Sequence, residues 1–172
     1  LLMPPTLRQP LVIAEAALDA VEDMERLLTV YSASSPMSEL NRAATRGPVR
    51  VDGRLFDILR RSAELTERTQ GAFDVSAGAL VKVWGFLKGP PRVPEGPERL
   101  AALARSGMRH VRLDEENLAV AYEVEGLEIN LGSIGKGYAI DRAVKRITDE
   151  FGVISALMQG GTSSVYGIGT PH

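Results

Sequence analysis

The sequence predicts an α+β fold, in which helices come first and a mostly antiparallel sheet packs with them. Two observations support this prediction. Apolar residues in the first part of the chain recur at three- and four-residue steps, which is the spacing of amphipathic helices. Later segments carry short apolar and β-branched runs separated by turn-forming residues. The 172 residues are enough for one domain with its own core and hardly for two, so we expect a single domain over residues 1–172.

The helical part begins with an amphipathic segment at residues 14–30, where charged residues lie opposite the apolar stripe. The polar segment 31–41, which contains one Pro, predicts a loop. Asp52 can cap a second helix that Gly71 would end. Residues 76–86 predict a short third helix.

A Gly- and Pro-rich stretch at residues 89–97 predicts a surface loop inside the domain, followed by a helix near 98–106. The apolar pattern then changes to that of strands, which we expect at residues 110–114, 117–124 and 127–131.

The last long helix is expected from Gly135 to Glu150, with Gly152 ending it. Residues 153–159 and 162–169 then predict two more strands around a pair of glycines.

Composition excludes several classes of function. The net charge is −2, so no basic surface favours nucleic acid as a partner. The chain has no cysteine, which excludes disulfides, thiolate metal sites and a Cys nucleophile. No apolar run approaches membrane-spanning length. We therefore expect membrane association only through a leader that is not present in this sequence.

The most informative segment is INLGSIGKGYAID at residues 129–141, where a short apolar run leads through a Gly-rich bend into a helix. A helix N-terminus presents unpaired N–H groups that suit a phosphate, and Lys136 adds a positive charge. An ordinary strand-to-helix connection explains the same residues, so both interpretations stay open. A Walker A loop is excluded because Gly137, and not Ser or Thr, follows the Lys. A G-x-G-x-x-G fingerprint is excluded because the third glycine is missing.

Two other segments have a functional and a structural interpretation. Asp74 follows Gly71 and Phe73, and it either lines a binding site or caps the next turn. Tyr31 follows the first predicted helix, and it either contacts a ligand or packs on the helix.

Together these segments resemble the bacterial FAD:protein FMN transferases, the ApbE-like family. The resemblance covers the chain from about residue 14 onward, in the order and spacing of four motifs. They stand here as Thr29-Val30-Tyr31, Ser38-Glu39-Leu40-Asn41, Gly71-Ala72-Phe73-Asp74 through Trp84-Gly85-Phe86, and Leu131-Gly132-Ser133-Ile134-Gly135-Lys136-Gly137-Tyr138 with Asp141. The resemblance implies an ApbE-like, T-fold-related domain of which this chain is the N-terminal and middle part, so that the fold is incomplete.

The resemblance also implies an activity. Such enzymes cleave FAD, transfer FMN to a Thr of a target flavoprotein, release AMP and need Mg²⁺. It assigns Ser133 to Mg²⁺ and Asp141 to tethering its helix. Contacts to FAD are implied for Tyr31, Ala72, Phe73, Asp74, Asn130 and Lys136.

No residue of the chain is assigned as the catalytic base, because the family's His-x-x-Asp/Asn-Pro-x-Thr-Gly motif is not found in it. Two other functions therefore remain alternatives: a protein that binds FAD or another nucleotide without turnover, and a scaffold without a ligand. The resemblance alone favours the cell envelope as the location.

Overall fold

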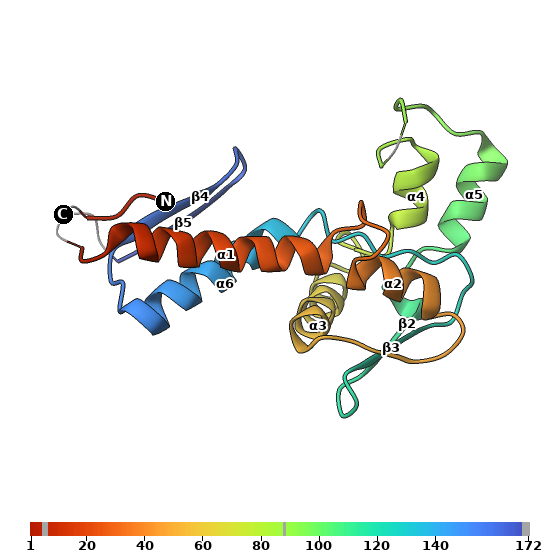
Figure 1. The fold of residues 1–172 in the computed structure, drawn as a ribbon. Helices are drawn as coiled ribbons and strands as arrows, with labels where there is room; N and C mark the ends of the chain where they lie inside the picture. The colour runs from red at the N-terminus through yellow and green to blue at the C-terminus, as the bar shows by residue number, and fades with distance from the viewer. Residues whose placement is uncertain (5–6, 88, 170–172) are drawn as a thin grey trace. The chain divides into compact units, whose positions relative to one another are not determined.

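The computed structural model describes residues 1–4, 7–87 and 89–169. The chain divides into two compact units, shown in Figure 1. The first unit combines Leu1–Leu27 with Ile134–His172, and the second is Leu28–Ser133. The expectation that residues 1–172 act as one domain stays a prediction.

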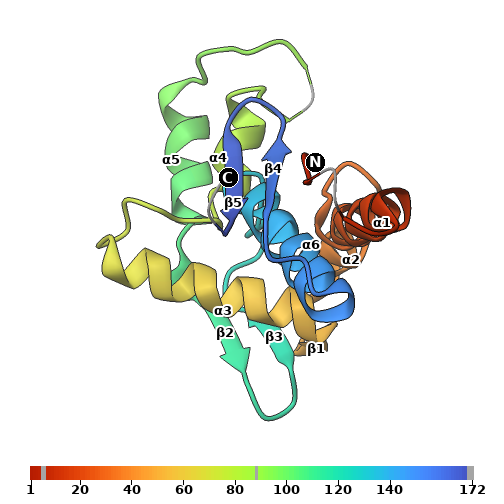
Figure 2. The same cartoon turned by 90° about the vertical axis from the view of Figure 1, so that its left-hand side faces the viewer.

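The first unit packs two helices and a hairpin around an apolar core. Helix α1 (Pro10–Leu28) lies beside α6 (Gly135–Phe151), and strands β4 (Ala156–Gly160) and β5 (Ser164–Ile168) form an antiparallel pair next to α6 (Figures 1 and 2). The core is built from small and branched apolar residues on the facing sides of these elements, namely Ile13, Ala17, Ala20, Ile140, Ala143, Val144, Ile147, Val153, Ala156 and Met158. Both predicted strands and the predicted last helix are therefore confirmed.

The second unit holds the other helices and a small sheet. Its helices are α2 (Pro36–Ala43), α3 (Gly53–Arg68), α4 (Gly78–Val83) and α5 (Gly96–Ala104), with a 3₁₀ turn η1 (Met108–His110). Strands β1 (Val49–Arg50), β2 (Val111–Asp114) and β3 (Ala119–Tyr122) form an antiparallel sheet in the order β1-β3-β2. The α+β class with antiparallel sheets is thus confirmed, in two small sheets and not one large one.

One predicted loop is wrong in part, because helix α2 (residues 36–43) begins inside the segment 31–41 that was expected to be irregular. Ser35 caps this helix by accepting a hydrogen bond of 3.1 Å from the amide of Ser38, and Pro36 occupies the first turn. Met37 and Leu40 are fully buried. Burial of these two side chains stabilises a helix whose overall composition is polar.

One predicted strand is also wrong, because residues 127–131 form no strand. The segment contacts its neighbours through an isolated parallel bridge between Ala77 and Glu128. Side-chain hydrogen bonds from α2 hold the next residue, Ile129. The backbone groups of this segment therefore form hydrogen bonds with a side chain of α2 and with the loop before α4, and not with a β-ladder.

Within residues 1–4, 7–87 and 89–169, no helix is both long and apolar enough to cross a membrane.

Candidate functional site

Asp74 organises the loop that follows α3. Its Oδ1 atom accepts hydrogen bonds from the Ser76 amide at 2.8 Å and the Ser76 hydroxyl at 2.5 Å, and its Oδ2 atom accepts one from the Met108 amide at 3.0 Å. Ser76 is fully buried, and its Oγ atom also accepts a bond of 2.7 Å from the Gly107 amide. The carboxylate therefore ties residues 74–76 to the turn before β2. The structural interpretation of Asp74, as a cap of the next turn, is confirmed.

The same loop lies against the segment that leads into the glycine bend. The amide of Asn130 donates a hydrogen bond of 2.8 Å to the carbonyl oxygen of Val75, and the amide of Gly78 donates one of 2.9 Å to the carbonyl oxygen of Glu128. Residues 74–78 and 128–130 thus run side by side. This pairing brings the segments of Asp74 and Asn130, two of the predicted site residues, next to each other.

The bend itself is partly occupied by a side chain of the protein. The Oδ1 atom of Asn130 accepts a hydrogen bond of 2.9 Å from the amide of Gly132. A Cβ atom on Gly132 would lie 3.0 Å from that oxygen, so a larger residue would crowd this turn. Gly132 and Ser133 are exposed beyond it. The side chain of Asn130 therefore stabilises the bend through this hydrogen bond.

Asn41 holds this segment from the other side, and sequence reasoning assigned it no role. Its side-chain Nδ2 atom donates to the carbonyl oxygen of Ile129 at 2.9 Å, and its Oδ1 atom accepts from the amide of Ile129 at 2.9 Å. The hydroxyl of Tyr122 donates to the same Oδ1 atom at 3.0 Å. The feature of the sequence that could have indicated a role for Asn41 was its position at the end of the Ser38–Asn41 motif.

The aromatic candidates lie near the surface of the second unit. Tyr31 is 67% exposed, and its amide donates to the Thr29 hydroxyl at 3.2 Å. Phe73 is half-buried, and its amide donates to the Thr69 hydroxyl at 3.0 Å. Ala72 is exposed beside it. Most of Tyr31 is therefore open to solvent, and its expected contact with a ligand stays a prediction.

Lys136 belongs to the first unit, in the first turn of α6. Its ammonium group donates a hydrogen bond of 2.9 Å to the hydroxyl of Ser163, in the turn between β4 and β5. The helix has no side-chain cap and no acidic residue in its first turn. An anion at this helix end would therefore meet the helix dipole and one ammonium group without a competing carboxylate.

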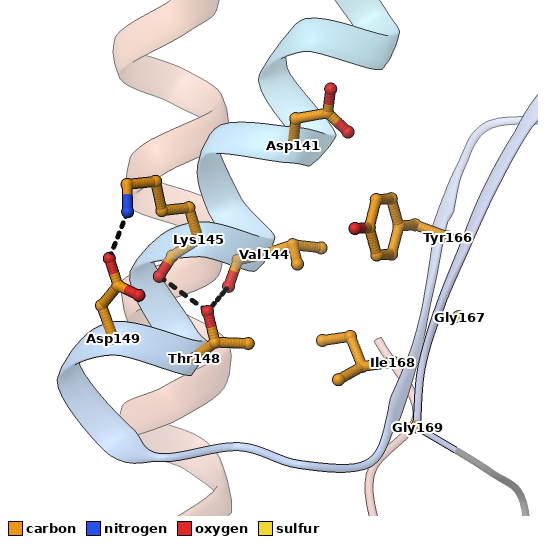
Figure 3. Close-up of a pocket in the computed structure, with 9 residues that line it drawn as sticks. All are labelled: Asp141, Val144, Lys145, Thr148, Asp149, Tyr166, Gly167, Ile168 and Gly169. Atoms are coloured by element: carbon orange, nitrogen blue, oxygen red, sulfur yellow. Dashed lines mark hydrogen bonds and ion pairs between the residues drawn. The ribbon is translucent and has the colours of Figure 1, made fainter.

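A pocket of about 550 Å³ lies between α6 and β5, also within the first unit (Figure 3). Figure 3 shows Val144, Tyr166 and Ile168 directed into this space, and Thr148 directing its hydroxyl back to its own helix. That hydroxyl donates to the carbonyl oxygens of Val144 and Lys145, each at 3.0 Å. Asp141 lines the same pocket and is exposed. The expected role of Asp141 as a helix tether stays a prediction.

Ser133 was expected to bind Mg²⁺. In the part of the chain that the structure describes, no group of three or more His, Cys, Asp or Glu residues is arranged to hold a metal ion. Mg²⁺ usually takes one or two carboxylates together with phosphates of the substrate. A site of that kind needs fewer than three protein carboxylates, so the expected role of Ser133 stays a prediction.

The comparison with known families shows the family of the chain. The family model described as "ApbE family" matches residues 3–172, nearly the entire chain. The chain belongs to the ApbE family. The resemblance drawn from the four motifs is thereby confirmed.

Individual relatives agree with this ApbE assignment. A FAD:protein FMN transferase of Klebsiella pneumoniae (strain 342) is 33% identical over 130 residues, which are 76% of this chain and 41% of the relative. A FAD:protein FMN transferase of Treponema pallidum (strain Nichols) is 30% identical over 150 residues, which are 82% of this chain and 41% of the relative. The chain thus spans less than half the length of these curated relatives.

Solved ApbE structures share the fold. The crystal structure of the ApbE protein from Thermotoga maritima superposes with a TM-score of 0.89 at 29% sequence identity, and the match covers 98% of this chain and 54% of that chain. The H257G mutant of the flavin transferase ApbE from Vibrio cholerae matches with a TM-score of 0.87 at 22% identity and supports the fold alone. The ApbE-like fold expected from the sequence is confirmed.

Proposed function

We propose that this ApbE-family chain belongs to an enzyme that transfers FMN from FAD to a Thr of a target flavoprotein, with release of AMP and a requirement for Mg²⁺. Its matched relatives are named FAD:protein FMN transferases. The observation that carries the proposal lies within the second unit, where residues 74–78 pair by hydrogen bonds with residues 128–130 and bring two motif-bearing segments together. In the first unit, the start of α6 has no side-chain cap. Such a helix start suits the diphosphate of a dinucleotide.

The proposed contacts follow from the chemistry of each group. The exposed ring of Tyr31 offers an aromatic face to the flavin nucleotide. The loop of Ala72, Phe73 and Asp74 would line the nucleotide pocket, with the Asp74 carboxylate keeping the loop in shape. The side-chain amide of Asn130 would hydrogen-bond FAD, and Lys136 would neutralise phosphate charge.

The transfer is a substitution at phosphorus. The hydroxyl oxygen of the acceptor Thr forms a bond to the phosphorus of the FMN part, and the bond between that phosphorus and the bridging oxygen breaks. The bridging oxygen and its electron pair leave with AMP. The Thr proton passes to a base, for which we assign no described residue. The described residues contribute by binding FAD and holding its diphosphate in place.

Mg²⁺ would neutralise charge on the phosphates when bound. We assign Ser133 one position of that site, through its backbone carbonyl oxygen.

Release of AMP tests the proposal directly. The protein is incubated with FAD, Mg²⁺ and a flavoprotein acceptor, and AMP is measured by chromatography while covalent flavin on the acceptor is measured by in-gel fluorescence. We expect AMP and flavinylated acceptor in equal amounts, and neither with an acceptor whose target Thr is replaced by Ala. FAD left intact by a full-length protein with Mg²⁺ present would exclude the transferase function.

Lys136→Ala tests the binding site within this chain. Loss of a charged hydrogen bond to phosphate removes about 1.5–3 kcal/mol, which is roughly a tenfold to hundredfold rise in the Kd for FAD. Ser163→Ala removes the hydrogen bond of the ammonium group to the turn but keeps the charge, so it should leave most of the affinity. Lys145→Ala removes an exposed charge of the same helix that pairs with Asp149 and serves as the control.

A second candidate function is FAD binding without turnover. It needs only binding groups such as the ammonium group of Lys136 at the start of α6, a helix without a side-chain cap. It predicts saturable binding of FAD, measured by quenching of flavin fluorescence, with no AMP formed. FAD that leaves the melting temperature unchanged and shows no fluorescence change would instead favour a scaffold, because a ligand bound only by the native state must stabilise it.

A further inference from the structure

Asn41 makes an unusual contact for a residue on a helix. Its carboxamide exchanges two hydrogen bonds of 2.9 Å with the backbone of Ile129, one to the carbonyl oxygen and one from the amide. This is the exchange that two opposed residues of an antiparallel ladder make with their backbones. The orientation of the carboxamide is determined by its partners, because a backbone amide can only donate and a carbonyl oxygen can only accept.

The third bond of Asn41 fixes its own side chain. The Tyr122 hydroxyl donates to the Oδ1 atom at 3.0 Å, and Tyr122 is 5% exposed. Ile129 is 1% exposed, so the backbone groups that Asn41 satisfies have no access to bulk water. Loss of the carboxamide would leave buried polar groups without partners, which favours local opening of the segment.

The residue after Ile129 is held from the opposite side. The amide of Asn130 donates to the carbonyl oxygen of Val75 at 2.8 Å. Ile129 is therefore hydrogen-bonded to α2, and Asn130 is hydrogen-bonded to the loop of Asp74. The hydrogen bonds from α2 all come from one side chain, that of Asn41.

We propose that Asn41 is a positioning residue, which sets the place of Asn130 and the following glycine bend for FAD. This inference rests on the proposed function, since it assumes that FAD binds at that bend. Asn41 itself touches the backbone of Ile129 and acts through it. An error of about 1 Å in a positioned group can lower the efficiency of a site by about a hundredfold.

The Asn side chain meets all three partners. Asp has the same shape and still accepts from the Ile129 amide and the Tyr122 hydroxyl, but it offers no donor to the Ile129 carbonyl oxygen. Ala satisfies none of the three. The series Asn41, Asn41→Asp and Asn41→Ala therefore removes the three hydrogen bonds of this side chain in steps.

The test combines FAD titration with amide hydrogen exchange on the protein without ligand. In Asn41→Ala we expect faster exchange at the Ile129 and Asn130 amides and a Kd for FAD raised about tenfold, which is about 1.4 kcal/mol. Asn41→Asp should give values between those of the wild type and of Asn41→Ala. Ile58→Val is the control for stability, because it trims a fully buried side chain of α3, lowers the melting temperature and should leave the Kd unchanged.

Two outcomes would overturn the inference alone. One is a wild-type protein that binds FAD together with an Asn41→Ala variant of unchanged Kd, even if the exchange is faster. The other is an Asn41→Ala variant whose loss of affinity is matched by Ile58→Val at equal melting temperature, which would make the effect one of stability. A wild-type protein that binds no FAD would instead remove the proposed function, and this inference with it.

Discussion

The backbone amide of Asn130 donates a hydrogen bond of 2.8 Å to the carbonyl oxygen of Val75, and this bond joins two segments that carry separate motifs of the ApbE family. On one side lies the loop that Asp74 shapes, and on the other the approach to the bend at Gly132. The site that we propose for FAD depends on this pairing. Four predictions test how its parts contribute.

Tyr122→Phe should change the response of the protein to alkaline pH. Burial, and next the charge of Glu128, raise the pKa of Tyr122 above its ordinary value of 10.0. The folded protein keeps this proton where the unfolded chain releases it, so the contribution of Tyr122 is fully present below about pH 10 and is lost as pH rises further. The free energy of unfolding should fall by up to about 1.4 kcal/mol per pH unit from this residue alone.

The measurement is urea unfolding of both proteins between about pH 8 and 11. At neutral pH the variant should be less stable by about 1 kcal/mol, because the Asn41 carboxamide loses a hydrogen bond. Above pH 10 the difference should shrink and then reverse. Parallel stability curves over the whole range would contradict the assignment.

Asp74→Asn should destabilise the protein by about 1–3 kcal/mol, because an amide nitrogen would face a donor in the Ser76 or Met108 amide. Thermal unfolding measures this change. Asp149→Asn, on the exposed side of α6, is the control and should stay within about 0.5 kcal/mol. A variant of wild-type stability that no longer binds FAD would show that the Asp74 carboxylate contacts the ligand itself.

Gly78→Ala should disturb the pairing with residues 128–130. A Cβ atom at this position would lie 2.5 Å from the carbonyl oxygen of Glu128, and backbone atoms cannot move aside as a flexible side chain can. We expect a loss of about 1–3 kcal/mol in the free energy of unfolding and weaker FAD binding. Gly96→Ala, where a Cβ atom meets nothing within 4 Å, is the matched control. Equal stability of the two variants would refute the close approach.

Gly137→Ala separates the two interpretations of the bend. A Cβ atom there meets nothing within 4 Å, and Ala is a better helix former than Gly by about 0.5–1 kcal/mol, so the melting temperature should rise. If the phosphates of FAD approach the start of α6, the added methyl group should also raise the Kd for FAD. A more stable variant with unchanged affinity would favour an ordinary connection without a phosphate.

Much of the fold follows from local patterns in the sequence. The three- and four-residue spacing predicted α1, the capping residue Asp52 predicted the start of α3, and Gly152 predicted the end of α6. Turn residues between apolar runs predicted the β2–β3 and β4–β5 pairs. Helix α2 was missed although its signal was local, since Ser35 and Pro36 form a capped helix start. The segment was predicted to be a loop because its composition is mostly polar, although two of its side chains are buried and stabilise the helix.

The sequence by itself determined the family, the α+β class and which residues are candidates for binding, because motifs and periodicity are properties of neighbouring positions. Only the tertiary structure decided that Asn41 replaces a strand partner for Ile129, 88 positions away, and that Asp74 ties two loops together. A hydrogen bond between a side chain and a distant backbone group leaves no periodic pattern in the chain. It forms only once folding has brought the two groups to within hydrogen-bond distance of each other.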